Sequence, residues 1–185
     1  MRFVLASASP RRKEILTKLG YDFTVHTSNV PENDIEGEIA EVVKTLAQRK
    51  AESVASQEEN ALIIAADTLV AIHGHRLGKP KDTDDAYRML RALSNETHQV
   101  YTGLCLINTA DNRKIVQAEK TNVTFEPLSD DEIFNYVNTG EPMDKAGSYA
   151  IQGGAARFVK CYEGSYDNIV GFPSELFIRL LPQIL

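Results

Sequence analysis

The stretch Leu62–Ile72, which reads LIIAADTLVAI, decides how the rest of the chain is interpreted. All of its residues except Asp67 and Thr68 are apolar, and a continuous apolar run of this length is typical of a β-strand buried on both faces. An ionised carboxylate in such a strand is costly unless another group compensates for its charge. We therefore interpret Asp67 as a functional carboxylate held at the end of a buried strand. The alternative is that the strand ends at Ala66 and that Asp67 caps a turn.

The residues after this strand predict a hairpin. The sequence HGHR, at residues 73–76, has the composition of a turn, and the sequence LGKP, at residues 77–80, is expected to carry Lys79 back along a paired return strand. Such pairing would place Lys79 near Asp67. An ammonium and a carboxylate that converge on one site suit chemistry on a phosphate group.

Length and charge limit the possible classes of protein. The chain has 185 residues, which suits one sizeable domain or two small lobes, and we predict one domain over residues 1–185. The formal net charge of −6 argues against a general nucleic-acid binder, which usually carries a basic surface. No apolar run approaches the ~18 residues that span a membrane, and Phe3–Ala6 is too short for the core of a signal peptide. We therefore predict a cytoplasmic protein that binds neither nucleic acid nor membrane.

The two cysteines have no spacing that suggests a metal site. Cys105 and Cys161 both stand among apolar residues, so we expect two free, buried thiols rather than a disulfide.

The first helix is expected to begin at an anion-binding end. Ser9 has the residue type of an N-cap, Pro10 suits the first helical position, and Gly20 marks the end of the helix. Arg11 and Arg12 fall in the first turn, where a cation is disfavoured by the helix dipole. Two cations at this end suggest an anionic partner, because free backbone N–H groups there also bind anions. The alternative is a solvated basic turn.

The remaining chain alternates between strands and helices, which predicts an α/β or α+β fold with a mixed sheet. Residues 140–154 are rich in glycine and lack periodicity, so we expect a structured functional loop there. The other expected elements are strands over 2–7, 21–27, 98–108, 114–125 and 156–161, and helices over 38–56, from 82 or 83 to 93, from a capping box at 129–132 to 140, and over 174–181.

Charged residues at expected strand ends and helix starts have the composition of a triphosphate site. Hydrolysis of a phosphate ester needs cations on the phosphate oxygens, a bridging divalent metal and a base that orients water. No GxxxxGK[ST] motif is present, so the chain is not a P-loop protein. The acidic loop 29–37 is by default solvated, with a metal ligand as the minority interpretation. The candidate residues are Arg11, Arg12, Lys50, Asp67, Lys79 and Lys145.

Seven short blocks resemble, in order, those of the Maf family of nucleoside triphosphate pyrophosphatases, also called septum formation inhibitors. Each block is weak alone, but together they are specific and cover nearly the whole chain. The blocks are LASASPRR at 5–12, ADT at 66–68, LGKP at 77–80, HQVYTG at 98–103, EPMDKAG at 141–147, IQG at 151–153 and GSY at 164–166.

The resemblance implies an inosine-triphosphatase-like fold, with an elongated mixed sheet, flanking helices and two lobes around a cleft. It implies a single Maf-like domain over residues 1–185 that hydrolyses a nucleoside triphosphate to the monophosphate and pyrophosphate. The EPMDKAG and IQG blocks resemble the subclass that acts on dTTP and UTP, rather than the sister subclass that acts on 7-methyl-GTP. A modified pyrimidine nucleotide is a further possible substrate, and the family suggests a homodimer.

The resemblance also assigns site residues. The general base of the family falls on Asp67, and the marks of the subclass fall on Arg11, Thr68 and Gln152. An amide such as Gln152 can both donate and accept, which suits a pyrimidine edge. The remaining substrate-binding candidates are Ser7, Arg12, Lys50, Lys79 and Lys145.

A divalent metal, Mg²⁺ or Mn²⁺, is expected to be held partly by the substrate phosphates, with Glu32 as a candidate ligand. Two other classes stay open at this point. A regulatory module would need no metal and show no turnover. Nucleic-acid binding through Arg11–Lys13 is disfavoured by the acidic charge and by the lack of interleaved aromatic residues.

Overall fold

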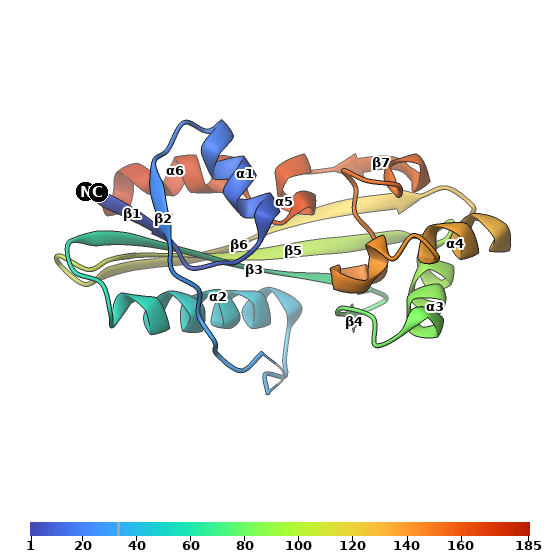
Figure 1. Ribbon diagram of the computed structural model, residues 1–185, viewed down its shortest axis with the longest axis horizontal. Coiled ribbons are helices and arrows are strands. Elements are labelled where there is room, and N and C mark those ends of the chain that lie inside the picture. The colour runs from blue at the N-terminus through green and yellow to red at the C-terminus, as the bar shows by residue number, and fades with distance from the viewer. Residues whose placement is uncertain (33) are drawn as a thin grey trace. The chain divides into compact units, whose positions relative to one another are not determined.

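The computed structural model describes residues 1–32 and 34–185 and shows a mixed α/β fold (Figure 1). The strands are β1 (Arg2–Leu5), β2 (Phe23–Val25), β3 (Ala61–Ile72), β4 (His75–Leu77), β5 (Thr97–Asn108), β6 (Arg113–Phe125) and β7 (Val159–Glu163). The α-helices are α1 (Pro10–Lys18), α2 (Ile39–Ala55), α3 (Thr83–Leu93), α4 (Asp130–Val137), α5 (Tyr166–Val170) and α6 (Ser174–Ile184). Three 3-10 helices are η1 (Glu141–Asp144), η2 (Ala146–Ser148) and η3 (Ala156–Phe158).

The strands form one seven-stranded sheet in the order β2-β1-β3-β5-β6-β7, with β4 paired to β3. β1 runs parallel to both β2 and β3, whereas β4 is antiparallel to β3 and β7 is antiparallel to β6. The expected mixed sheet with flanking helices is therefore confirmed.

The chain divides into two compact units. The first comprises residues 1–68, 102–119 and 171–185, and the second comprises residues 69–101 and 120–170. The chain passes between the units within β3, β5 and β6, and again after α5, between Val170 and Gly171. The single domain over residues 1–185 stays a prediction.

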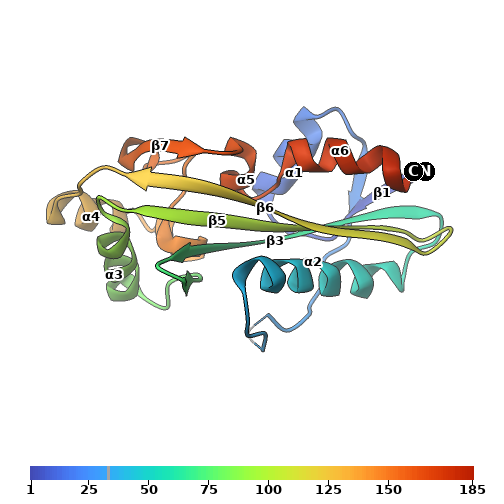
Figure 2. The ribbon, with the colours of Figure 1, turned by 180° about the vertical axis from the view of Figure 1, so that it is seen from behind.

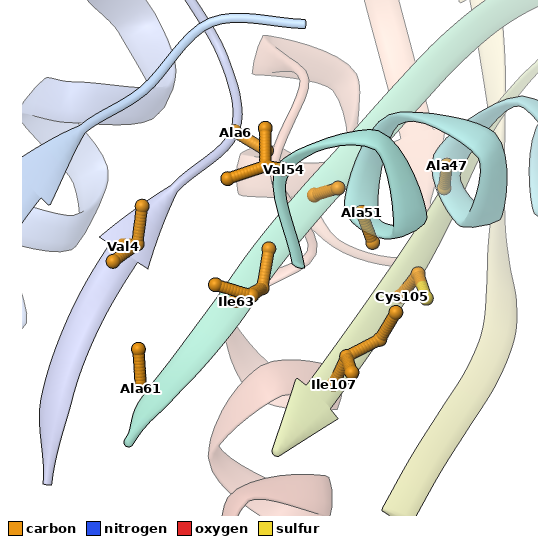
Figure 3. Close-up of a cluster of buried hydrophobic side chains, with 10 residues drawn as sticks. Val4, Ala6, Ala47, Ala51, Val54, Ala61, Ile63, Cys105 and Ile107 are labelled. Atoms are coloured by element: carbon orange, nitrogen blue, oxygen red, sulfur yellow. The ribbon is translucent and has the colours of Figure 1, made fainter. Parts of the chain in front are cut away.

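In the first unit, helices cover both faces of the sheet. α2 lies on one face, and α1 and α6 lie on the other (Figures 1 and 2). Small residues on α2 bring this helix close to the strands, as Figure 3 shows for Ala47, Ala51 and Val54 above Ile63 and Cys105. The close approach continues at β5, where a Cβ on Gly103 would overlap the carbonyl oxygen of Val43. The buried cluster is Val4, Ala6, Ala47, Ala51, Val54, Ala61, Ile63, Ala65, Cys105 and Ile107.

The second unit has an aromatic core. The ring of His98 packs edge-on against Phe125 and Tyr149, and its Nε2 lies 2.7 Å from the Tyr149 hydroxyl. Burial lowers the pKa of His98 to about 3, so this side chain is neutral. At the edge of this core α3 and α4 lie side by side, joined by an ion pair of 2.5 Å between Arg91 and Asp130 (Figure 2).

Several local predictions are confirmed. β3 continues through Asp67 to Ile72, so the alternative of a strand that ends at Ala66 is wrong. The hairpin after β3 turns at His73 and Gly74, whose φ angles of 49° and 78° suit a tight two-residue turn. The capping box at Ser129 is present, with both reciprocal hydrogen bonds.

Two predictions are wrong near β7. The segment expected as a strand from residue 156 begins as the 3-10 helix η3, and the strand starts only at Val159. Both cysteines are free thiols, as expected, but Cys161 is exposed whereas Cys105 is buried. β7 is the last strand in the sheet order, and all its residues after Val159 are exposed, Cys161 among them.

Within the described residues, no helix has both the length and the apolar character that crossing a bilayer requires.

Candidate active site

The carboxylate of Asp67 is compensated by a lysine from α2. Asp67 lies within β3 with 6% of its surface exposed, and its Oδ1 is 2.6 Å from the ammonium of Lys50. The Lys50 side chain is itself only 12% exposed. The packing of small residues on α2 against the sheet brings this lysine to the strand. A buried carboxylate is tolerated in an apolar strand because it is paired in this way.

A second carboxylate reaches the same ammonium. Glu32 Oε1, from the loop between β2 and α2, lies 2.8 Å from Lys50 Nζ, and the Glu32 side chain is about half exposed. The carboxylates of Glu32 and Asp67 thus contact one nitrogen atom and lie close together. Among residues 1–32 and 34–185, no three His, Cys, Asp or Glu side chains gather into a group that would hold a metal ion.

The Arg12 guanidinium, on α1, donates hydrogen bonds to three other segments of the first unit. Nε donates to the carbonyl of Gly171 at 2.8 Å, Nη1 donates to Ser7 Oγ at 3.2 Å, and Nη2 donates to Thr68 Oγ1 at 3.2 Å. Thr68 Oγ1 also lies 3.0 Å from the hydroxyl of Thr102 on β5. The structure therefore brings the predicted residues Arg12, Ser7 and Thr68 together.

The charges around Arg12 act on its pKa in opposite directions. Burial lowers the pKa of the guanidinium, Asp67 and Glu32 raise it, and the neighbouring charge of Arg11 lowers it. An arginine remains protonated even when its pKa falls below the usual range, because that range is far above neutral pH. Arg12 therefore supplies a fixed positive charge near the Asp67 carboxylate.

The N-terminus of α1 has the expected cap. The Ser9 hydroxyl accepts from the backbone N–H of Arg12 at 3.5 Å, and Pro10 occupies the first helical turn. Ser7 accepts from the backbone N–H of Ser9 at 3.2 Å, which fixes the strand-to-helix connection. Arg11 is half-buried in this first turn. The basic helix start predicted from the sequence is thus confirmed in its local structure.

Three other predicted residues, Lys79, Lys145 and Gln152, belong to the second unit. The backbone N–H of Gly147 donates to the carbonyl of Gly78 at 3.1 Å and so joins the segments that carry the two lysines. A Cβ on Gly147 would lie 2.9 Å from a methyl carbon of Val70, so β3 fits tightly against this junction.

The two lysines differ in their surroundings. The pairing of β4 with β3 ends at Leu77, so the expectation that Lys79 lies on the paired return strand is wrong, and Lys79 is exposed. The ammonium of Lys145 donates to the backbone carbonyl of Glu141 at 3.1 Å and to Asp144 at 2.5 Å. Gln152 is exposed between the buried Ile151 and the half-buried Gly153.

Sequence reasoning missed Thr102 and the Gly171 carbonyl as partners in this site. Thr102 stands in the HQVYTG block but has no distinctive local signal. Gly171 adopts a φ of 121°, which favours glycine. The glycine before Phe172–Pro173 is therefore the sequence signal that could have marked this turn.

Comparison with known proteins agrees with the fold and with the sequence blocks. Residues 2–184 match the family described as Maf-like protein. A protein of Thermoanaerobacter sp. (strain X514) is 49% identical over 179 residues, which cover 96% of this chain and 94% of that protein. A protein of Pelotomaculum thermopropionicum is 50% identical over 171 residues, which cover 92% of this chain and 90% of that protein. Both are named dTTP/UTP pyrophosphatase.

Among solved structures, the Staphylococcus aureus Ham1 protein has a TM-score of 0.56 with 16% identity and covers 99% of each chain. That likeness concerns the fold alone, and with it the expected inosine-triphosphatase-like fold class is confirmed. The match over residues 2–184 and the identity of about half to full-length relatives show that this chain belongs to the Maf family.

Proposed function

We propose that this protein is a nucleoside triphosphate pyrophosphatase that hydrolyses dTTP and UTP to the nucleoside monophosphate and pyrophosphate. The observation that carries the proposal is 49% identity over 96% of the chain to a relative named dTTP/UTP pyrophosphatase. The geometry of the first unit supports the reaction type, because the buried Asp67 carboxylate pairs with Lys50 on α2 and lies near Arg12 in the first turn of α1.

In the proposed reaction, Asp67 is the general base. Its carboxylate accepts a proton from a water molecule while the oxygen of that water forms a bond to the α-phosphorus. The bond between the α-phosphorus and the bridging oxygen breaks, and pyrophosphate leaves with the electron pair of that bond. The Lys50 ammonium, 2.6 Å from Asp67 Oδ1, fixes the orientation of the carboxylate. A positioned base of this kind typically contributes about 10²–10⁴-fold in rate.

The cations of the first unit are proposed to bind the phosphates. Arg11, Arg12 and Lys50 supply three positive charges against the two negative charges of Glu32 and Asp67. Arg12 is held by Ser7, Thr68 and Gly171, so its guanidinium needs little reorganisation when charge develops on the phosphate.

The carboxylates fit a divalent metal as part of the proposal. Mg²⁺ and Mn²⁺ prefer oxygen ligands, and Mg²⁺ is commonly bound by one or two carboxylates together with substrate phosphates. Glu32 is half exposed beside Asp67 and would hold such an ion together with the phosphates. When bound, the ion would neutralise charge on the phosphate oxygens.

Base selectivity is assigned in the proposal to the second unit. Gln152 would meet the pyrimidine edge with its amide, and Lys79 and Lys145 would add positive charge to substrate binding. The proposal includes the homodimer that the family resemblance implies, the cytoplasmic location expected from the lack of long apolar runs, and residues 1–185 as one catalytic domain. Sedimentation tests for the homodimer, and localisation of the tagged protein tests for the cytoplasm. A single cooperative unfolding transition tests for one domain.

The proposal is tested by measuring pyrophosphate release from dTTP, UTP, CTP, ATP and GTP, with and without Mg²⁺ or Mn²⁺. We expect metal-dependent turnover with dTTP and UTP preferred. Gln152→Ala should lower the ratio of kcat/KM for dTTP to that for CTP by about one order of magnitude, since an unpaired polar group costs ~1–3 kcal/mol. Asn135→Ala, which removes an exposed amide on α4, is the matched control. A purine preference overturns the substrate assignment, and absence of turnover favours a regulatory module.

A further inference from the structure

The turn that presents Gln152 is held on both sides of this residue. Within Ala150–Gly154, Ile151 is buried and the N–H of Gly153 donates to the carbonyl of Ala150 at 3.0 Å. The Gln152 side chain is exposed between these fixed neighbours. The direction in which the Gln152 amide points therefore depends on the residues that hold the backbone of Ala150–Gly154 in place.

One carboxylate holds the C-terminal side of the turn. Glu141, on η1, accepts the backbone N–H of Gly154 with Oε2 at 3.1 Å and Oε1 at 3.4 Å. The carboxylate also lies against Gly153, where a Cβ would be 2.6 Å from Glu141 Cδ and would overlap Oε1. A side chain at position 153 would therefore displace this carboxylate, although the φ angle of Gly153 does not itself require glycine.

A tyrosine holds the N-terminal side of the turn. The hydroxyl of Tyr136, on α4, accepts the backbone N–H of Ala150 at 3.0 Å. Burial and the nearby Glu141 carboxylate both raise the pKa of Tyr136, so the phenol keeps its proton. The ring carbon Cε2 would be 3.1 Å from a Cβ on Gly154, so the ring supports the turn as well.

We infer that Glu141, together with Tyr136, is a positioning residue for base selectivity, because it fixes the turn that aims the Gln152 amide. This inference rests on the proposed function of Gln152. Glu141 does not itself contact the base. Its carboxylate holds Gly154 directly and lies beside Tyr136, whose hydroxyl holds Ala150. Loss of the carboxylate therefore frees the C-terminal side of the turn and loosens the support at Ala150, while the Gln152 amide stays intact.

The test uses a double-mutant cycle on selectivity. Glu141→Ala should lower the ratio of kcat/KM for dTTP to that for CTP by about fivefold or more, with most of the change in KM for dTTP. In a Gln152→Ala background, the same substitution should leave the ratio unchanged, since residues that act through one another are not additive. Glu141→Gln retains an acceptor oxygen and should recover most of the selectivity. Asp131→Asn, which neutralises an exposed carboxylate on α4, should behave as wild type.

Amide hydrogen exchange of the ligand-free protein provides an independent measurement. In Glu141→Ala the amides of Ala150 and Gly154 should exchange at least about tenfold faster than in the wild type, whereas Asp131→Asn leaves them unchanged. Additive effects in the cycle, or unchanged exchange in Glu141→Ala, overturn the inference. If the wild type releases no pyrophosphate, the proposed function fails, and the exchange rates alone then decide whether Glu141 holds the turn.

Discussion

Lys50 Nζ lies 2.6 Å from Asp67 Oδ1, and both side chains are nearly buried, at 12% and 9% exposure. This pair joins α2 to β3 and allows an acidic residue to occupy an otherwise apolar strand. The same ammonium contacts Glu32 at 2.8 Å, so it balances two carboxylates. Removal of Lys50 therefore affects both stability and the proposed chemistry, whereas Asp67→Asn leaves Lys50 paired with Glu32.

Lys50→Met should destabilise the fold by about 3 kcal/mol, because it leaves the Asp67 carboxylate buried without a cation. Urea unfolding at pH 7 measures this change. Lys44→Met is the matched control, since Lys44 pairs with Glu41 on the exposed part of the same helix and such pairs contribute less than ~1 kcal/mol. Equal effects of the two substitutions would show that burial of the pair has no energetic consequence.

Arg12→Ala should raise KM for dTTP and also lower stability by about 2 kcal/mol, because the guanidinium bonds to Ser7, Thr68 and Gly171 are lost together. Arg12→Lys should recover little, since an ammonium cannot reproduce the planar fork. Steady-state kinetics and thermal unfolding measure the two effects. Lys18→Ala, at the exposed end of α1, serves as the control. Unchanged kinetics in Arg12→Ala would make the basic turn purely structural.

Gly147→Ala should destabilise the protein more than Gly140→Ala. Both glycines have positive φ angles, 69° and 76°, so both substitutions carry a similar backbone cost of about 1 kcal/mol. Only at Gly147 does the added Cβ meet another group, since it would lie 2.9 Å from Val70, whereas the space at Gly140 is open. Thermal unfolding of the two variants compares them directly. Equal shifts would contradict the tight fit between η2 and β3.

The buried His98 should make stability depend on pH. Its pKa of about 3 in the folded state lies below the ordinary value of 6.5, so the unfolded chain binds the proton more readily between these pH values. Stability is therefore lost as pH falls through this window. Between pH 6.5 and pH 4.5, we expect the wild type to lose about 2 kcal/mol more than His98→Phe. Parallel pH profiles of unfolding free energy would contradict a neutral, buried His98.

Local signals account for what could be predicted from the sequence. The apolar run around Asp67 predicts β3, and Ser9, Pro10 and Gly20 predict α1, because caps and periodicity act within a few residues. The basic turn at Arg12 and the acidic strand at Asp67 were both recognisable as candidates, because each places a charge where the local structure disfavours it.

Contacts between distant segments account for what could not be predicted. The bond from Arg12 to the Gly171 carbonyl joins residues at opposite ends of the chain, and no periodicity reports it. Cys161 stands among apolar residues in the sequence but is exposed on β7, and the local pattern does not show that β7 is an exposed strand at the end of the sheet. The carboxylate of Glu141 against Gly153 is likewise visible only in three dimensions.

The central claim is that Asp67 is the general base. Pyrophosphate release from dTTP by Asp67→Asn, compared with that by the wild type, tests it most directly. An asparagine keeps the size of the side chain and an acceptor for Lys50 but cannot take a proton from water. We expect the variant to unfold at a temperature close to that of the wild type and to lose about 10²–10⁴-fold in kcat. Asp22→Asn, an exposed position in the same unit, should retain full turnover. A folded Asp67→Asn protein with near-normal kcat would remove Asp67 from the mechanism.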